Sequence, residues 1–300
     1  MGSAQTTSRA FDDFAKRHTL LKKTQDPISG LQAEIYSTPA RPNEPIILLT
    51  EEFDEKSSEA FANFKKKVNE RKQFHPNITN LVFVDNHEQS TYCYEKITTH
   101  VAFEFSDASI ATARERLSSS SRVKDLKTTP PHAVREFLGQ TLAGVEFLAS
   151  KKGFAGFVKP AQILVLSPNK LEKIYKIVEF SPLNRTPHMY ARMLVEKEYY
   201  APLDPYLMKA FREKKREVNY NTGCDVWALG VSALCFIFNK DFSYYYDWQK
   251  EEIKIEKIKQ DIQLLQTSGY DPAVVKVLMA MLEPDASKRL GPGSLMMMIK

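Results

Sequence analysis

The sequence predicts an α+β fold with two lobes, in which a smaller strand-rich part precedes a larger helix-rich part. Up to Ile97, short apolar runs alternate with proline-containing, acidic or polar stretches, which is typical of strands joined by turns. From Pro130 onward, apolar residues recur at the spacing of amphipathic helices, and Val226–Phe238 is apolar on all sides. Strands grouped ahead of helices favour an α+β architecture.

The front part begins with a predicted helix and continues mainly as strands. Phe11 and Phe14 share one face of the helix expected over Ser8–Arg17. Three strands follow, at Thr19–Lys23, Leu31–Thr38 and Ile46–Thr50. A helical pattern is then carried by Phe61, Phe64, Val68 and Phe74. Two further strands are expected at Leu81–Val84 and Thr91–Ile97, with Asn86–Gln89 as the polar turn between them.

The rear part is predicted to be helical after a polar first segment. Ser106–Leu126 is polar and partly helical, and the serine run Ser118–Ser121 is expected to be a loop. Pro130-Pro131 then opens an amphipathic helix, whose apolar face runs from Val134 to Leu148. Later helices are expected at Val226–Phe238, Trp248–Leu265, Pro272–Leu282 and Ser294–Ile299. The predicted organisation is an N-terminal extension at residues 1–17 and one domain at 18–300, with lobes at 18–98 and 99–300.

Composition indicates a soluble protein of a reducing compartment, so the cytoplasm is the expected location. Hydrophobic residues make up 43% and charged residues 26% of the chain, which is ordinary for a globular protein. No apolar run approaches the ~20 residues of a membrane-spanning helix, and the N-terminus lacks the apolar stretch of a secretory signal. Cys93, Cys224 and Cys235 have neither paired spacing nor a histidine at ligand distance, which indicates buried thiols.

The net charge of +5 slightly favours acidic partners, such as a cytoskeletal filament, and no nucleic-acid partner is expected. Most basic residues are interleaved with acids, as on solvated helix faces. Gly2 follows Met1 in a pattern that fits N-myristoylation, although the same start can be a cloning remnant. A single acyl chain anchors only marginally, so membrane contact needs a second signal. Basic residues that could supply it are Arg9, Lys16, Arg17, Lys22 and Lys23.

A series of short motifs in a fixed order carries the chemistry. Lys159–Val165 reads Lys-Pro-Ala-Gln-Ile-Leu-Val, and Val178–Ser181 reads Val-Glu-Phe-Ser after the strand-like Lys173–Val178. Further motifs are Tyr-Tyr-Ala-Pro-Leu at Tyr199–Leu203, Asp-Val-Trp-Ala-Leu-Gly at Asp225–Gly230, Asp285 with Arg289, and His-Pro-Asn-Ile at His75–Ile78. In order and spacing these motifs resemble the eukaryotic protein kinase family over residues 18–300. The resemblance implies a kinase-like fold with structural landmarks at His75, Pro160, Phe180, Pro202, Asp225, Trp227, Gly230 and Arg289.

The resemblance also implies which positions should carry phosphoryl transfer, and the residues found there differ from the family's pattern. The phosphate loop matches Thr24–Gly30, where only Gly30 is a glycine and Pro27 removes a donor N–H. The other positions are those of the phosphate-gripping strand lysine, its glutamate partner, the catalytic aspartate, and the metal-holding asparagine and aspartate. They are occupied by Leu49 (or Thr50, depending on register), Lys66, Phe157, Gln162 and Glu179, respectively.

We therefore expect a non-enzymatic pseudokinase without a cofactor, which acts as a scaffold, structural component or allosteric partner in a protein assembly. The alternatives are a nucleotide-binding switch and an atypical ATP-dependent transferase, both relying on Lys159 and Glu179, with Lys66 as a substitute for the missing strand lysine. Tyr94, placed before Glu95 of the expected inter-lobe hinge, would narrow the nucleotide pocket.

The retained and exposed residues suggest further roles. Asp225 is expected to bond the backbone of the catalytic loop. Arg289 should find another carboxylate or turn to solvent, because Leu203 replaces its usual acid. A possible site for an acidic partner is formed by Arg212, Lys214, Lys215 and Arg216. The aromatic stretch Tyr244–Trp248 favours either an interface or packing within the lobe.

Overall fold

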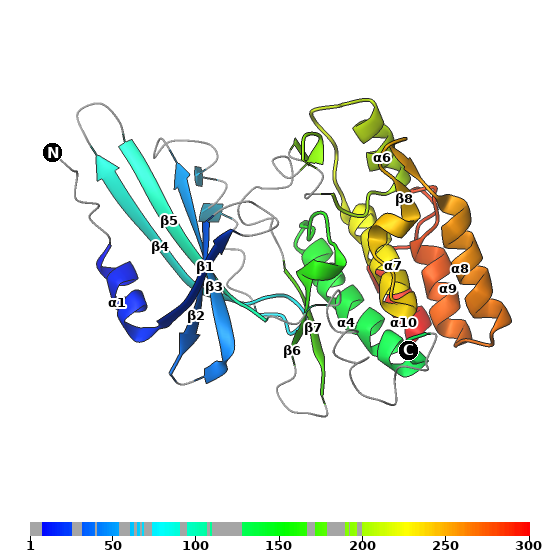
Figure 1. Ribbon diagram of the computed structural model, residues 1–300, viewed down its shortest axis with the longest axis horizontal. Helices are drawn as coiled ribbons and strands as arrows, with labels where there is room; N and C mark the ends of the chain where they lie inside the picture. Colours follow the sequence, from blue (N-terminus) through cyan, green and yellow to red (C-terminus); the bar gives the residue numbers. More distant parts are fainter. Residues whose placement is uncertain are drawn as a thin grey trace. The chain divides into compact units, whose positions relative to one another are not determined.

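The protein forms two units, which are described here from a computed structural model. The described residues are 8–25, 32–39, 41–53, 61–62, 65–66, 68, 74–90, 95–106, 109, 128–166, 172–178, 190–191, 193–196 and 200–300. The N-terminal unit comprises Met1–Phe74, Thr79–Ser106 and Pro182–Arg185, and the C-terminal unit comprises His75–Ile78, Asp107–Ser181 and Thr186–Lys300. A β-sheet dominates the first unit and helices dominate the second (Figure 1). The predicted α+β class is confirmed.

An antiparallel five-stranded sheet forms the N-terminal unit, in the order β1-β2-β3-β5-β4. Its strands are β1 (Thr19–Gln25), β2 (Gln32–Thr38), β3 (Arg41–Phe53), β4 (Leu81–Ser90) and β5 (Glu95–Glu104). Successive side chains of a strand point to opposite faces, and both faces of this sheet carry apolar residues. In β3, for example, Leu48 belongs to one buried cluster and Leu49 to the other.

Helical residues cover both faces of the sheet. Phe14 of α1 (Arg9–Arg17) stacks on Phe83 and meets Tyr36 edge-on, with ring centroids 4.6 and 5.4 Å away. The Ser8 side chain caps this helix by accepting a hydrogen bond from the Phe11 N–H. On the opposite face, Phe61 and Val68 pack in the cluster that contains Leu49. The predicted leading helix is therefore confirmed, and it closes one face of the sheet.

In the N-terminal unit, one expected turn, one expected strand and one expected helical residue are wrong. Asn86–Gln89 is not a turn but part of β4, where Asn86 pairs with Thr99 and accepts a hydrogen bond from its hydroxyl. The strand expected at Thr91–Ile97 instead runs over Glu95–Glu104, so Glu95 begins β5 and is not in a hinge after it. The unit consequently extends to Ser106 rather than to residue 98. Phe74 lies outside any helix and is 71% exposed.

Helices make up most of the C-terminal unit. They are α4 (Pro131–Ser150), α6 (Pro205–Arg212), α7 (Thr222–Phe238), α8 (Ile255–Thr267), α9 (Pro272–Met281) and α10 (Pro292–Ile299). Among its described residues, two short antiparallel pairs and two 3₁₀ turns accompany the helices, namely β6 (Ile163–Leu166) with β7 (Ile174–Ile177), β8 (Tyr246–Asp247) with β9 (Glu252–Ile253), η1 (Pro160–Gln162) and η4 (Phe242–Tyr245).

The centre of this unit is α7, which is buried from Cys224 to Ile237. Its uninterrupted apolar composition predicted this burial, and Asn239 ends the helix in a left-handed conformation. Cys224 and Cys235 are free buried thiols, as expected. Helix α7 packs against α4 and α9, and α4 also packs against α10.

The helix expected over Trp248–Leu265 begins only at Ile255, because the chain first forms β8 and β9. Trp248 instead stacks between Tyr200 and Tyr246, with ring centroids at 4.0 and 5.0 Å. Tyr245 and Tyr246 are buried and pack within the unit, whereas Tyr244 is 38% exposed.

Several predicted features lie outside the described residues. They are Gly2, the Thr24–Gly30 loop beyond Gln25, Phe64, Cys93, Tyr94, Ser118–Ser121, Glu179 and Phe180. Within the described part of the chain, no helix is both long and apolar enough to cross a membrane.

Candidate functional site

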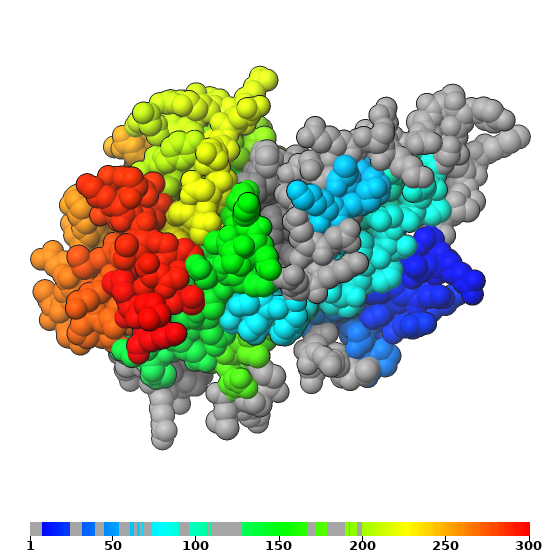
Figure 2. All heavy atoms as spheres, turned by 180° about the vertical axis from the view of Figure 1, so that it is seen from behind, coloured from blue at the N-terminus to red at the C-terminus, as the bar shows by residue number. Residues whose placement is uncertain are grey.

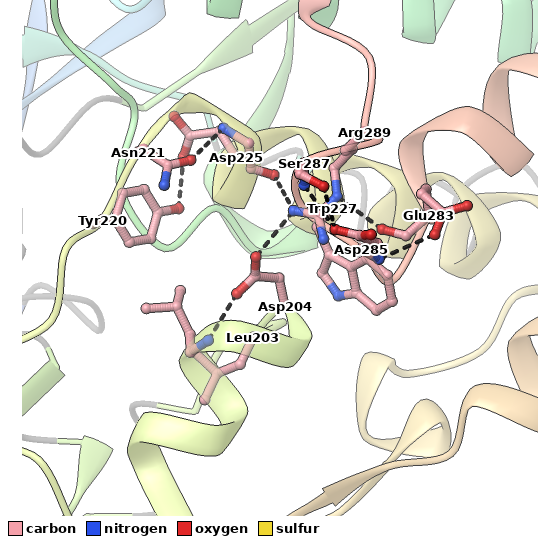
Figure 3. A network of polar contacts seen from close by, with 12 residues as sticks. Leu203, Asp204, Tyr220, Asn221, Asp225, Trp227, Glu283, Asp285, Ser287 and Arg289 are labelled. Atoms are coloured by element: carbon pink, nitrogen blue, oxygen red, sulfur yellow. Dashed lines mark hydrogen bonds and ion pairs between the residues drawn. The ribbon is translucent and has the colours of Figure 1, made fainter.

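The loop that precedes β6 and contains Ala155 and Gly156 is held in place by Asp225 of α7. The Asp225 carboxylate is fully buried and accepts hydrogen bonds from the N–H groups of Ala155 and Gly156, at 2.6 and 3.0 Å. The hydroxyl of Tyr220 also donates to Asp225, at 2.7 Å (Figure 3). Burial, followed by the Asp225 charge, raises the pKa of Tyr220 well above its ordinary value, so its hydroxyl keeps the proton that it donates. The expected role of Asp225 is thereby confirmed.

The Phe157 side chain packs in an aromatic cluster. Its backbone has a φ of 51°, in the left-handed region, and its N–H donates to the Tyr220 oxygen at 2.8 Å. The ring is 1% exposed and lies 4.7 Å from the Tyr220 ring and 6.2 Å from the Tyr190 ring, between centroids. The position predicted for a catalytic aspartate therefore holds a packed apolar side chain on a conformation that few such residues adopt.

Gln162 uses its amide oxygen inside the loop. Its Oε1 accepts a hydrogen bond from the Lys159 N–H at 2.8 Å, across the turn η1. The Gln162 side chain is fully buried, and its Nε2 has no hydrogen-bond partner among the described residues. Lys159 is itself buried, with 8% of its surface exposed. The loop thus contains a buried amide donor and, three residues earlier, a buried lysine.

At the strand position expected to hold a phosphate-gripping lysine, Leu49 is buried in the core cluster and pairs with Ala33. The neighbouring Thr50 places its hydroxyl 3.1 Å from Nδ1 of His100. Lys66, at the position of the partner glutamate, is exposed.

These described side chains do not fit magnesium-bound ATP. They offer no ammonium at the strand position and no carboxylate at the catalytic-loop position. Among the residues that the structure describes, no three His, Cys, Asp or Glu side chains gather closely enough to hold a metal ion by themselves. Glu179, the remaining predicted metal ligand, lies outside the described residues.

Arg289 finds its carboxylate one residue after the expected position. Leu203 is buried, and the next residue, Asp204, places its Oδ2 3.0 Å from Nη1 of Arg289 (Figure 3). Both side chains are 1% exposed. Asp204 also caps α6, because its Oδ1 accepts a hydrogen bond from the Leu207 N–H. Sequence reasoning missed Asp204, although an Asp-Pro pair at a helix start is a capping signal.

The remaining landmarks serve packing. The Arg289 guanidinium lies 5.1 Å from the Trp227 ring centroid, and the Trp227 indole N–H donates to the Tyr246 hydroxyl at 3.1 Å. A Cβ at Gly230 would lie 2.9 Å from the Leu282 side chain, which explains the glycine there. Pro160 and Pro202 are buried. Phe180 cannot be placed among them because it lies outside the described residues.

His75 anchors its turn within the C-terminal unit. Its Nδ1 accepts a hydrogen bond from the Asn77 N–H at 3.2 Å, and its ring stacks on Phe147 at 4.7 Å. Asn77 in turn donates to Gln140 and to the Tyr175 carbonyl. The motif therefore fixes this turn on α4 and β7.

The predicted partner site is an exposed turn at the end of α6. We call Arg212, Lys214, Lys215 and Arg216 the basic turn, and all of its members are exposed. Lys214 forms an ion pair with Glu251, and Lys215 forms one with Glu213 at 2.9 Å. Among the described residues, no ion pair involves Arg212 or Arg216. These two arginines therefore carry most of the positive field that the turn offers to solvent.

Comparison with protein families gives one match. The family described as the protein kinase domain matches residues 49–298 of this chain. No curated protein matches the chain significantly.

Proposed function

The chain belongs to the protein kinase family, and we propose that it is a pseudokinase, which binds a partner protein instead of transferring phosphate. The observation that carries the proposal is the buried Phe157 ring at the position of the catalytic aspartate. Phosphoryl transfer needs a carboxylate there to orient the acceptor hydroxyl, and phenylalanine can neither accept a proton nor orient a hydroxyl.

Two further positions support the same proposal. Leu49 is buried in the core at the position where the family has a lysine that binds phosphate. The side-chain oxygen of Gln162, which would otherwise face a metal ion, accepts a hydrogen bond from the N–H of Lys159 in the same loop. Losing a single catalytic group typically slows an enzyme by ~100-fold or more. The catalytic aspartate and the phosphate-binding lysine serve different parts of the same reaction step. Because both are replaced, we expect negligible phosphate transfer.

Phosphate transfer to a mixed set of serine, threonine and tyrosine peptides tests the enzymatic part. We expect no incorporation above background, and the same background for the Glu179→Ala variant. Incorporation that depends on magnesium and disappears in Glu179→Ala would overturn the proposal and favour an atypical transferase.

A nucleotide-binding switch is the second candidate, and the buried Gln162 Nε2, which has no hydrogen-bond partner among the described residues, favours it together with the buried Lys159 three residues earlier. The Gln162 amide can donate to a phosphate or to a purine acceptor, and Lys159 adds a positive charge in the same loop. Specific binding at a hundred times the dissociation constant would stabilise the fold by ~2.7 kcal/mol. Thermal unfolding with millimolar ATP, with and without magnesium, separates the two: we expect no shift, whereas a shift lost in Lys159→Met would favour the switch.

We propose that the partner is an acidic protein surface, such as that of a cytoskeletal filament, and that it is bound by the basic turn. The exposed arginines Arg212 and Arg216 support this proposal, together with the net charge of +5. Tyr206, six residues before Arg212 on α6, is 46% exposed and offers an aromatic contact. A location in the cytoplasm stays a prediction from the sequence.

Co-sedimentation with polymerised filaments tests the partner surface. Reversing Arg212 and Arg216 to glutamate should weaken binding by ~10-fold or more and reduce its sensitivity to salt. The matched control reverses two exposed lysines away from the turn, Lys151 and Lys276. Equal binding by both variants, or equal loss in both, would show that the basic turn is not the site.

A further inference from the structure

The first strand of the N-terminal sheet exposes two adjacent leucines. Strand β1 lies at the edge of the sheet, and its pairing with β2 shifts between Leu20 and Lys22, so that Leu21 is an extra, bulged residue. Leu20 is 42% exposed and Leu21 is 57% exposed. Large apolar side chains side by side at a sheet edge cost solvation energy unless another surface covers them.

Basic side chains flank these leucines on both sides in the sequence. Lys16 and Arg17 form the last turn of α1, and Lys22 follows the bulge; all three are exposed. No ion pair involves any of the three among the described residues, whereas Lys23 is paired with Glu34 at 2.9 Å. Between residues 8 and 25 there are five Lys or Arg and two Asp, a net charge of +3. We call Lys16, Arg17, Leu20, Leu21 and Lys22 the α1–β1 surface.

We propose that the α1–β1 surface docks the protein on an anionic membrane. Exposed leucines enter the boundary between headgroups and acyl chains, while flanking lysine and arginine side chains meet the acidic headgroups. This combination of apolar and basic groups complements a negatively charged bilayer in both of its chemical features. Figure 2 shows α1, in dark blue, at the surface of the N-terminal unit.

The geometry disfavours the other anionic partners. A peptide strand adding to β1 would need a regular row of free N–H and C=O groups, and the bulge at Leu21 interrupts that row. Lysines on an edge strand also discourage such pairing. Single-stranded nucleic acid is bound largely by stacking on aromatic side chains, and the α1–β1 surface has none.

This inference is independent of the proposed pseudokinase function, because it concerns exposed residues of the N-terminal unit alone. The α1–β1 surface would also serve as the second membrane-binding signal that a myristoylated Gly2 needs. Gly2 lies only six residues before Ser8, which caps α1. One acyl chain binds membranes reversibly, and a basic apolar surface beside it would make the attachment stable. The surface itself should bind without the acyl chain, only more weakly.

Vesicle co-sedimentation of the full chain without acylation tests the proposal. We expect binding to phosphatidylcholine vesicles that contain phosphatidylserine, little binding to phosphatidylcholine alone, and a decline with added salt. The variant Lys16→Glu, Arg17→Glu, Lys22→Glu should bind ~10-fold or more weakly. The variant Leu20→Ser, Leu21→Ser keeps the charge and should also bind roughly tenfold more weakly.

The control reverses three exposed lysines of the C-terminal unit, Lys151, Lys152 and Lys276, and thereby makes the same change in net charge. It should bind vesicles as the wild type does. Unchanged binding by either test variant, or an equal loss in the control, would overturn the proposal. So would binding of polyglutamate but not of anionic vesicles, which would indicate an acidic protein as the partner. Thermal unfolding of each variant confirms that it is folded.

Discussion

Asp204 and Arg289 form a buried ion pair although they lie 85 residues apart in the chain. The motif pattern placed Leu203 where the acid was expected, and it predicted only that Arg289 needs some carboxylate. Which carboxylate serves could not be read from the sequence, because the answer depends on the fold bringing the start of α6 to the segment after α9. The Asp-Pro pair indicated a helix cap but not a second role for its free oxygen.

Removing the Asp204 carboxylate should destabilise the C-terminal unit strongly. Asp204→Ala leaves the Arg289 charge buried without its partner, and we expect a loss of ~3–5 kcal/mol in the free energy of unfolding. Asp204→Asn keeps an acceptor for the helix cap, so its cost isolates the charge. The double variant Asp204→Ala, Arg289→Met should recover much of the loss because no unpaired charge remains. Urea denaturation measures all three; a double variant as unstable as the sum of the singles would contradict the pairing.

Helices whose apolar residues form a clear pattern were predicted well from the sequence. Strands whose extent depends on hydrogen bonding to a neighbouring strand were not. Helix α4 begins at the predicted proline because its apolar residues recur at helical spacing. Helix α7, predicted from a segment that is apolar on all sides, ends at the predicted Phe238 but begins four residues before Val226. The sequence predicts only the first half of β4, Leu81–Val84, because the second half contains Asn86–Gln89, which is polar and resembles a turn. That half stays extended because β5 supplies the ladder, with Asn86 opposite Thr99 and Gln89 opposite Lys96. A partner strand leaves no local signal in the sequence.

Two glycines of α4 provide a matched test of helix packing. A Cβ at Gly144 would lie 2.9 Å from the Asn77 carbonyl oxygen, a backbone atom that cannot move aside cheaply, whereas a Cβ at Gly139 would meet nothing within 4 Å. Gly144→Ala should therefore destabilise the unit by ~1–3 kcal/mol. Gly139→Ala should stabilise it by ~0.5–1 kcal/mol through helix propensity alone. Chemical denaturation of both variants decides, and a stabilising Gly144→Ala would show that the turn at Asn77 does not dock on α4.

For the whole molecule, the kinase-like order of motifs predicted the fold class, but the division into units was displaced. The N-terminal unit ends at Ser106 because β5 continues to Glu104, which pairs with Ile46 of β3. The short turn His75–Ile78 belongs to the C-terminal unit although strands on both sides of it belong to the other. Each unit has a buried core of its own, so each can respond separately to solution conditions.

Acid should destabilise both units, each through one histidine. Burial and, secondarily, the charge of Lys176 lower the pKa of His75 in the C-terminal unit. Burial likewise lowers the pKa of His100 in the N-terminal unit, helped by His87 and opposed by Asp85 and Glu34. Both histidines are held neutral in the fold, His75 as an acceptor for Asn77 and His100 stacked 4.1 Å from the Phe11 ring. A lowered folded-state pKa gives stability that is present above the ordinary value of 6.5.

That stability should be lost as the pH falls below 6.5 through the folded-state pKa of each group. His75→Asn, which keeps an acceptor for the Asn77 N–H, should flatten the acid decline of the C-terminal unit. His100→Gln should flatten that of the N-terminal unit, where hydrogen exchange of β5 and α1 reports unfolding locally. Hydrogen exchange measured at neutral and mildly acidic pH distinguishes the two histidines, because each variant should slow acid-induced exchange only in its own unit. A double variant that declines as steeply as the wild type would show that these histidines do not set the acid stability.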